Sequence, residues 1–173
     1  DTMQGRRHLA ILSLLYESGA RVQELIDLTP ADLSLEPPAY VTLFGKGRKT
    51  RVVPLQERLV TIMRRYLSEH KLDLPGREKN HLFYNNRGAK LSNSGIAHII
   101  TLYANDVRVK HPGILPDKIS PHSFRHSKAM HLLQAGLNLI YIRDILGHAS
   151  IKTTEIYARA DSKQKRDALE KAY

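Results

Sequence analysis

The chain has 173 residues, and Lys and Arg outnumber Asp and Glu by 27 to 17, giving a formal net charge of +10. The hydrophobic content of 42% suits one ordinary globular domain. The sequence has no long apolar run, which excludes a membrane span. It has no cysteine, which excludes disulfides, thiolate catalysis and cysteine-based zinc sites. The charge favours a polyanionic partner, above all nucleic acid, although a basic charge that serves only solubility is the alternative.

The first third of the chain predicts helices followed by a β-hairpin. Apolar residues at helical spacing in RRHLAILSLLYESG predict a helix that Gly19 ends. RVQELIDL predicts a second short helix, and Thr29 followed by Pro30 is typical of another helix start. Residues 40–44 and 50–53 are rich in Val and Thr and predict two strands joined by the turn GKGRK.

The rest of the chain predicts helices separated by polar loops. Residues 55–69 form one helix, a second begins after Ser92 and runs to about Asn105, and residues 110–117 form a loop. Further helices are bounded by capping residues: Ser120 to Gly136, Asn138 to Gly147, Ser150 through Tyr157, and a charged helix from Asp161 to the C-terminus. The predicted fold class is therefore mainly α with a small antiparallel β-sheet (α+β).

The run SPHSFRHSKAM places His122, Arg125 and His126 at the start of a predicted helix. His122 and His126 have the spacing of a helical zinc pair, but Ser123 stands where the protease motif needs Glu, which disfavours a metal site. Helical N–H groups, the helix dipole and the Arg125 fork all suit an anion such as phosphate. The alternative is a solvated basic face.

Four other residues are candidates for the same chemistry. Arg21 follows a glycine-ended helix with Glu24 one turn on, and Lys46 stands at the hairpin tip between two glycines. His148 follows a helix stop, and Tyr157 lies in the next short helix. Three of them have a plainer alternative: Arg21 as a surface arginine paired with Glu24, Lys46 as part of a solubilising turn, and Tyr157 as a core tyrosine. The glycines around Lys46 lack the spacing of a phosphate loop, so ATP binding is not expected.

Taken in order, Arg21, Lys46, His122-x-x-Arg125, His148 and Tyr157 resemble the catalytic set of the tyrosine recombinases, the phage integrase family. The flanking stretches SGARVQELIDL, GKGRKTRVVPL, PHSFRHSKAMHLLQAG and LGHASIKTTEIYA are similar too, so the resemblance covers nearly the whole chain. It implies that residues 1–173 form a single catalytic domain with the integrase fold. Family members usually carry an N-terminal core-binding domain, often preceded by an arm-binding domain. Both are absent here, so the chain resembles a fragment of a longer recombinase.

The resemblance also implies a mechanism. Tyr157 would attack a DNA phosphodiester while Arg21 and Arg125 hold the non-bridging oxygens, and His122 would accept the tyrosine proton. His148 would donate a hydrogen bond to a phosphate oxygen, and Lys46 would protonate the departing 5′ oxygen. The product would be a 3′-phosphotyrosine and a 5′-hydroxyl, with no cofactor and no metal required. Glu24 is expected to orient Arg21, and His126 is not expected to take part in catalysis.

The implied partners are double-stranded DNA and three further copies of the chain, in a homotetramer that holds two duplexes, with no membrane involved. Accessory proteins are not specified by the sequence. The expected location is the cytoplasm, at the nucleoid. The residues around the motifs resemble most closely those of recombinases from integrative mobile elements. Two other functions stay open at this point: a DNA-binding regulator that lost the chemistry, and a strand-nicking enzyme like type IB topoisomerases.

Overall fold

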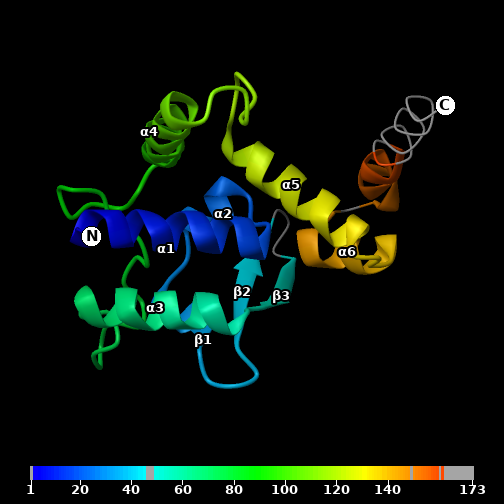
Figure 1. The fold of residues 1–173 in the computed structure, drawn as a ribbon. Coiled ribbons are helices and arrows are strands. Elements are labelled where there is room, and N and C mark those ends of the chain that lie inside the picture. The colour runs from blue at the N-terminus through cyan, green and yellow to red at the C-terminus, as the bar shows by residue number, and fades with distance from the viewer. Residues whose placement is uncertain (1, 46–48, 149, 160, 162–173) are drawn as a thin grey trace.

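The computed structural model describes residues 2–45, 49–148, 150–159 and 161. In chain order (Figure 1) its elements are α1 (Met3–Ser18), α2 (Val22–Ile26), the 3₁₀ turn η1 (Pro30–Asp32), β1 (Leu33–Ser34), β2 (Tyr40–Phe44), β3 (Thr50–Pro54), α3 (Glu57–Glu69), α4 (Asn93–Lys110), α5 (Pro121–Gln134) and α6 (Leu139–Leu146). Residues 151–159 form a further helix. The predicted class, mainly α with a small antiparallel sheet, is confirmed. No helix in these ranges has the length and apolarity needed to cross a membrane.

The sheet has three antiparallel strands in the order β1-β2-β3, one more than the predicted hairpin. The segment after Thr29 was expected to begin a helix, but it makes only the three-residue turn η1 before the chain extends. Leu33 then pairs with Val41. A two-residue strand is too short to show the alternation of apolar and polar residues that identifies strands in sequence.

Capping residues set most helix ends where the sequence predicted them. Gly19 follows α1 in the left-handed conformation, with φ at 57°, and Gly147 does the same after α6, with φ at 65°. The helix α4, however, continues to Lys110 rather than ending near Asn105. Its last turn is held by Arg108, which donates to the carbonyls of residues 116 and 117 at 2.6 and 2.8 Å. The charged helix predicted from Asp161 lies, beyond that residue, outside the described residues.

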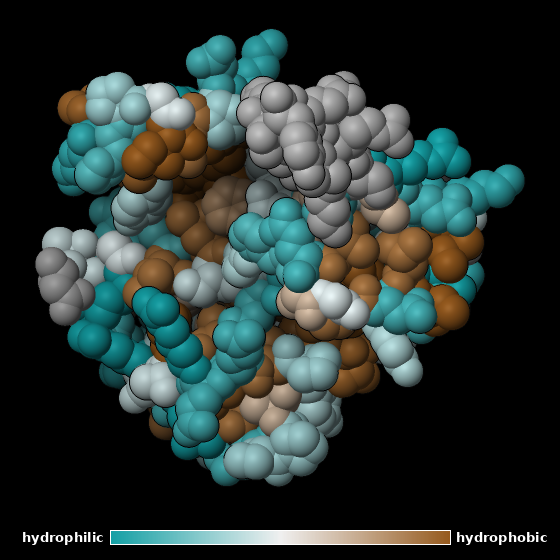
Figure 2. All heavy atoms as spheres, turned by 45° about the vertical axis from the view of Figure 1, so that its right-hand side comes forward, coloured by the Kyte–Doolittle hydropathy of each residue, from teal (hydrophilic) through white to brown (hydrophobic). Residues whose placement is uncertain are grey.

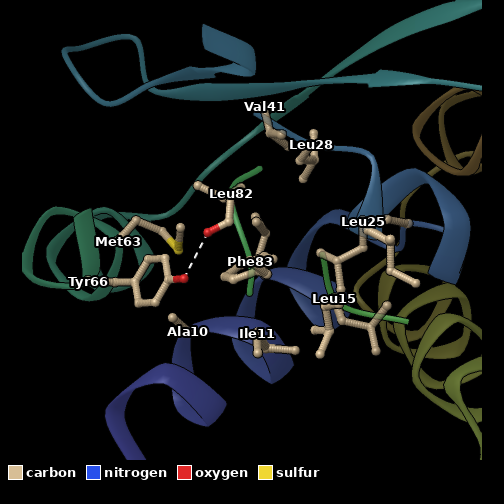
Figure 3. Close-up of a cluster of buried hydrophobic side chains, with 14 of the residues drawn as sticks. Ala10, Ile11, Leu15, Leu25, Leu28, Val41, Met63, Tyr66, Leu82 and Phe83 are labelled. Carbon is tan, nitrogen blue, oxygen red and sulfur yellow. Dashed lines mark hydrogen bonds between the residues drawn. The ribbon is translucent and has the colours of Figure 1, made fainter. Parts of the chain in front are cut away.

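Two hydrophobic clusters hold these elements together. In the larger one, α1 packs against α3 on one side and α5 on the other, and the inner face of the sheet closes over it (Figures 1 and 3). Its centre includes Ile11, Leu15, Val41 and Phe83, each fully buried. The smaller cluster joins α5 to α6 through Ala129, Ile142 and Leu146. The candidate site lies where the ends of these two clusters meet.

The surface over α6 mixes polar and apolar side chains. Figure 2 brings this side of the molecule forward and shows hydrophilic side chains across the middle of the face, with hydrophobic ones gathered beside them. Ile140 and Tyr141 on α6 are exposed, as is Ile156 on the following helix. The small cluster therefore buries only part of the apolar surface of these helices.

One buried hydrogen bond in the larger cluster generates a stability prediction. Tyr66 is 1% exposed, and its hydroxyl donates to the carbonyl of Leu82 at 2.8 Å (Figure 3). We expect Tyr66→Phe to lower the free energy of unfolding by about 1–3 kcal/mol, because the buried carbonyl loses its donor. The matched control is Tyr141→Phe, which removes a hydroxyl from an exposed ring. Equal urea midpoints for the two variants would contradict the prediction.

Candidate active site

The site forms where the C-terminal ends of α1 and α6 meet. Both helices end in a left-handed glycine, and both ends are tightly packed. A Cβ atom at Gly19 would lie 2.7 Å from Cδ2 of Leu146, and one at Gly147 would lie 2.9 Å from Nη1 of Arg51. Any larger residue would be both strained at these φ angles and blocked by its neighbours. The glycines therefore allow the two helix ends to approach one another.

The last carbonyl groups of α6 hold three arginines. Carbonyls at a helix C-terminus lack intrahelical partners and carry the negative end of the helix dipole, so they attract guanidinium groups. The donor and acceptor pairs are Arg51 Nε to Ile145 at 2.8 Å, Arg125 Nη2 to Leu146 at 2.5 Å and Arg21 Nη2 to Gly147 at 3.2 Å. Three consecutive main-chain oxygens thus accept hydrogen bonds from three arginines, which come from β3, α5 and the start of α2.

Arg125 is the innermost of the three. It is buried, and its other terminal nitrogen donates to the carbonyl of Gly19 at 2.5 Å, so it joins the ends of α1 and α6 directly. Burial, followed by the charges of Arg21 and Arg51, lowers the pKa of Arg125 to about 10. The guanidinium still carries its charge at neutral pH.

Glu24 supplies the carboxylate that balances this cluster. Its oxygens accept from Arg51 Nη1 and Nη2 at 2.9 and 2.7 Å, from Arg21 Nη1 at 2.9 Å and from the Arg21 backbone at 2.8 Å. Burial opposes ionisation, but the bonds from the two arginines outweigh it and leave the pKa of Glu24 below its usual value. The sequence expectation that Glu24 orients Arg21 fits this geometry. Its partnership with Arg51 was not anticipated.

His148 is positioned by the end of α6. Gly147 donates its backbone N–H to Asp144, and His148 donates its own to Arg143, which is the Schellman pattern of a helix C-terminus. The His148 ring nitrogen Nδ1 lies 2.9 Å from the hydroxyl of Thr154. Burial, followed by the charges of Arg125, Arg21 and Arg51, lowers the pKa of His148 to about 4. The ring is therefore neutral at neutral pH.

Tyr157 lies between two imidazoles. Its ring centroid is 6.1 Å from that of His148, with the planes 21° apart, and 5.0 Å from that of His126. Tyr157 is half-buried against the small cluster of α5 and α6. The structure thus brings four of the six predicted residues together: Arg21, Arg125, His148 and Tyr157.

The other two predicted residues stand differently. His122 is exposed on the first turn of α5, and no hydrogen bond within the described part of the chain links it to Tyr157. Lys46 lies outside the described residues, so its predicted place at the hairpin tip is untested. In the parts of the chain that the structure describes, no three His, Asp or Glu side chains gather as a metal site would need.

A cleft of about 480 Å³ opens beside these residues. Its lining consists of Arg21, Gly45, Lys49, Thr50, Arg51, Arg143, Asp144, Gly147 and His148. Four of these side chains are cationic and one is acidic, so the cleft suits an anion.

Three contacts in the site were missed from sequence. Arg51 shares a strand face with the buried Val53, and a charge on an inward face is a signal that could have been used. The link from Thr154 to His148 carries no such signal, because it runs from the loop after α6 to the next helix and follows no helical or strand spacing. No catalytic role is predicted for His126, yet its ring lies beside that of Tyr157.

Sequence comparisons identify the class of protein that this fold and site define. The model of the phage integrase family matches residues 1–164. Tyrosine recombinase XerC of Thermodesulfovibrio yellowstonii is 37% identical over 180 aligned positions, covering 100% of this chain and 56% of that protein. Tyrosine recombinase XerD of Halalkalibacterium halodurans is 36% identical, and the match covers 96% of this chain and 56% of that protein. The chain belongs to the phage integrase family, the tyrosine recombinases, and spans about half the length of these relatives.

Solved structures agree with this assignment. A XerH site-specific recombinase bound to palindromic difH substrate, in a post-cleavage complex, has a TM-score of 0.80 and 26% identity, covering 98% of this chain and 46% of its own. XerA recombinase has a TM-score of 0.74 and 33% identity, with 94% and 59% covered. The Tn1549 transposon integrase shows the same fold, with a TM-score of 0.73 and 24% identity. That match covers 95% of this chain and 60% of the integrase chain.

The buried carboxylate of the site generates a second stability prediction. We expect Glu24→Gln to lower the free energy of unfolding by about 3–5 kcal/mol, because an amide leaves two guanidinium groups without their counter-charge. The control is Glu36→Gln, the same change in an exposed pair with Arg64. That pair should contribute little. Chemical denaturation of both variants measures the difference, and a Glu24 variant as stable as the control would refute the role of this carboxylate.

The depressed pKa of His148 generates a prediction about pH. In the unfolded chain a histidine titrates near about 6.5, so between that value and the folded value of about 4 the unfolded state binds more protons. Stability must therefore fall as the pH falls through this window. We expect His148→Gln to lose less stability than the wild type between about pH 7 and about pH 5. Parallel losses in urea titrations at both pH values would contradict this.

Proposed function

We propose that this protein cleaves and rejoins DNA strands through a covalent 3′-phosphotyrosine, with Tyr157 as the nucleophile. The observation that carries the proposal is the position of Tyr157 beside His148, next to a cationic cleft in a member of the tyrosine recombinase family. XerH, to which the chain is similar, has been captured with its DNA substrate in a post-cleavage complex. That complex supports a DNA substrate here.

The arrangement of charge suits attack on a phosphodiester. Arg21 and Arg51 pair with the buried carboxylate of Glu24, and Arg125 donates to the Leu146 carbonyl beside them. Three guanidinium groups against this carboxylate leave a positive excess that a phosphate can neutralise. Arg21 and Arg125 would hold the non-bridging oxygens of the phosphate, and their electrostatic effect increases as negative charge builds up in the transition state. Because both arginines are already anchored on α6, little reorganisation is needed when the substrate binds.

The bond changes balance without an external energy source. The phenol oxygen of Tyr157 forms a bond to phosphorus as the bond from phosphorus to the 5′ oxygen breaks. The tyrosine proton would pass to His122, and Lys46 would protonate the leaving oxygen. His148 would donate a hydrogen bond to a phosphate oxygen. Attack by a 5′-hydroxyl from a second duplex reverses the step, and a homotetramer holding two duplexes would exchange strands.

Several finer features belong to the same proposal. The chain would act as the catalytic domain of a longer recombinase with a separate DNA-binding domain. Its origin in an integrative mobile element, and its action on DNA at the nucleoid in the cytoplasm, stay predictions from the sequence motifs. The named sequence relatives are Xer recombinases, and the Tn1549 integrase supports the fold alone.

A covalent trap tests the proposal. Duplexes with a nick near the centre and randomised flanking bases let the cleaved 5′ fragment diffuse away, so that any phosphotyrosine adduct accumulates. We expect an adduct that survives denaturing gels with the wild type and none with Tyr157→Phe, because only the phenol oxygen can form the link. Sequencing of the trapped duplexes then gives the preferred site.

The control is Tyr141→Phe, an exposed tyrosine on the neighbouring helix, which should leave the adduct yield unchanged. A wild-type protein that binds the duplexes without forming an adduct would favour a DNA-binding regulator. An adduct followed only by relaxation of supercoiled DNA, with no exchange between duplexes, would favour an enzyme of the topoisomerase type.

A further inference from the structure

The hydroxyl of Thr154 lies within hydrogen-bond distance of a ring nitrogen of His148. Thr154 is fully buried in the helix at residues 151–159, and its Oγ1 lies 2.9 Å from Nδ1 of His148. A buried hydroxyl needs a hydrogen-bond partner, and among the residues that the structure describes this ring nitrogen is the one within reach. The contact joins the loop after α6 to the helix that carries Tyr157.

The protonation state of His148 determines what this contact can do. The ring is neutral at neutral pH, because burial and the charges of Arg125, Arg21 and Arg51 disfavour the imidazolium. A neutral imidazole has one N–H donor and one bare acceptor nitrogen, and the partner of one nitrogen decides which of the two carries the proton. The two tautomers differ in what they present to a ligand.

Only one tautomer suits the cleft. The cleft is lined by Arg21, Arg51 and His148 itself and attracts anions, which accept hydrogen bonds and repel a bare lone pair. A proton on Nε2 would present a donor to the anion, whereas a proton on Nδ1 would leave Nε2 as an acceptor. The second state would cancel part of the attraction that the arginines provide.

We propose that Thr154 is a positioning residue that donates its hydroxyl proton to Nδ1 of His148 and so keeps the ring proton on Nε2, ready to donate to a phosphate oxygen. The part of this inference that concerns phosphate rests on the proposed function. The direction of the hydrogen bond is a property of the free protein and does not depend on it.

The position of Thr154 in its helix extends this role to the nucleophile. Thr154 and Tyr157 are three residues apart, so they lie on the same side of the helix. The rings of His148 and Tyr157 are 6.1 Å apart and nearly parallel. A hydrogen bond that fixes His148 to this helix therefore also fixes the distance between the histidine and the attacking oxygen.

The direction of the bond is tested by NMR of the free wild-type protein with ¹⁵N-labelled histidine. Long-range correlations within the rings separate the two tautomers, and His148→Gln identifies the signals of this residue. We expect a protonated Nε2 and an unprotonated, hydrogen-bonded Nδ1 at neutral pH. A ring that carries its proton on Nδ1 would overturn the proposal without any variant having to fold.

The consequence for chemistry is tested with three variants in the covalent trap. Thr154→Val keeps the volume and removes the hydroxyl, and we expect adduct formation about tenfold slower, the effect of losing one hydrogen bond. Thr154→Ser keeps the hydroxyl and removes a buried methyl group, and should cleave within about threefold of the wild type although it is less stable. Thr153→Val makes the same change at an exposed neighbour and should have no effect.

The outcomes separate the two proposals. A purely structural role for Thr154 would make cleavage follow stability, so a serine variant slower than the valine variant would overturn the positioning role. Valine variants at 153 and 154 with equal rates would overturn it as well. A wild-type protein that forms no adduct at all would instead refute the proposed function, and the NMR result would still decide the direction of the hydrogen bond.

Discussion

The whole site depends on the attraction between the C-terminal end of α6 and three guanidinium groups. The carbonyls of residues 145, 146 and 147 each accept from a different arginine, and those arginines come from segments far apart in the chain. Three like charges in one place repel one another, so the helix end and the carboxylate of Glu24 must offset that repulsion before the fold can close. Packing of α6 on α5 and β3 is therefore coupled to the electrostatics of the cleft.

This coupling explains how the region can be both cationic and closely packed. The carboxylate of Glu24 balances part of the arginine charge, and main-chain dipoles balance more of it, yet an excess remains on the side that faces the cleft. Burial, reinforced by the same excess, lowers the pKa of His148 and keeps its ring neutral. A site of this kind holds its donors in fixed positions before a ligand arrives, which is the condition for strong electrostatic stabilisation of a transition state.

Local signals in the sequence predicted much of this, and contacts over long distances explain what they missed. The bounds of α6 follow from Asn138 and Gly147, because capping chemistry is local. The end of α4 does not, since Arg108 holds it through carbonyls of a later loop. The residue types of the site were visible as motifs. Arg51 was missed because its partner carbonyl lies 94 residues further along the chain, a contact that no spacing rule describes.

The use of main-chain oxygens as anchors has a consequence for sequence diversity. A backbone carbonyl is present whatever side chain stands at its position, so the acceptors at residues 145 and 146 persist through substitution there as long as the helix packs. Residue 147 is the exception, because its left-handed backbone and the nearby Arg51 leave no room for a side chain. Libraries that diversify this helix for directed evolution can therefore vary its outer positions freely while keeping one glycine invariant.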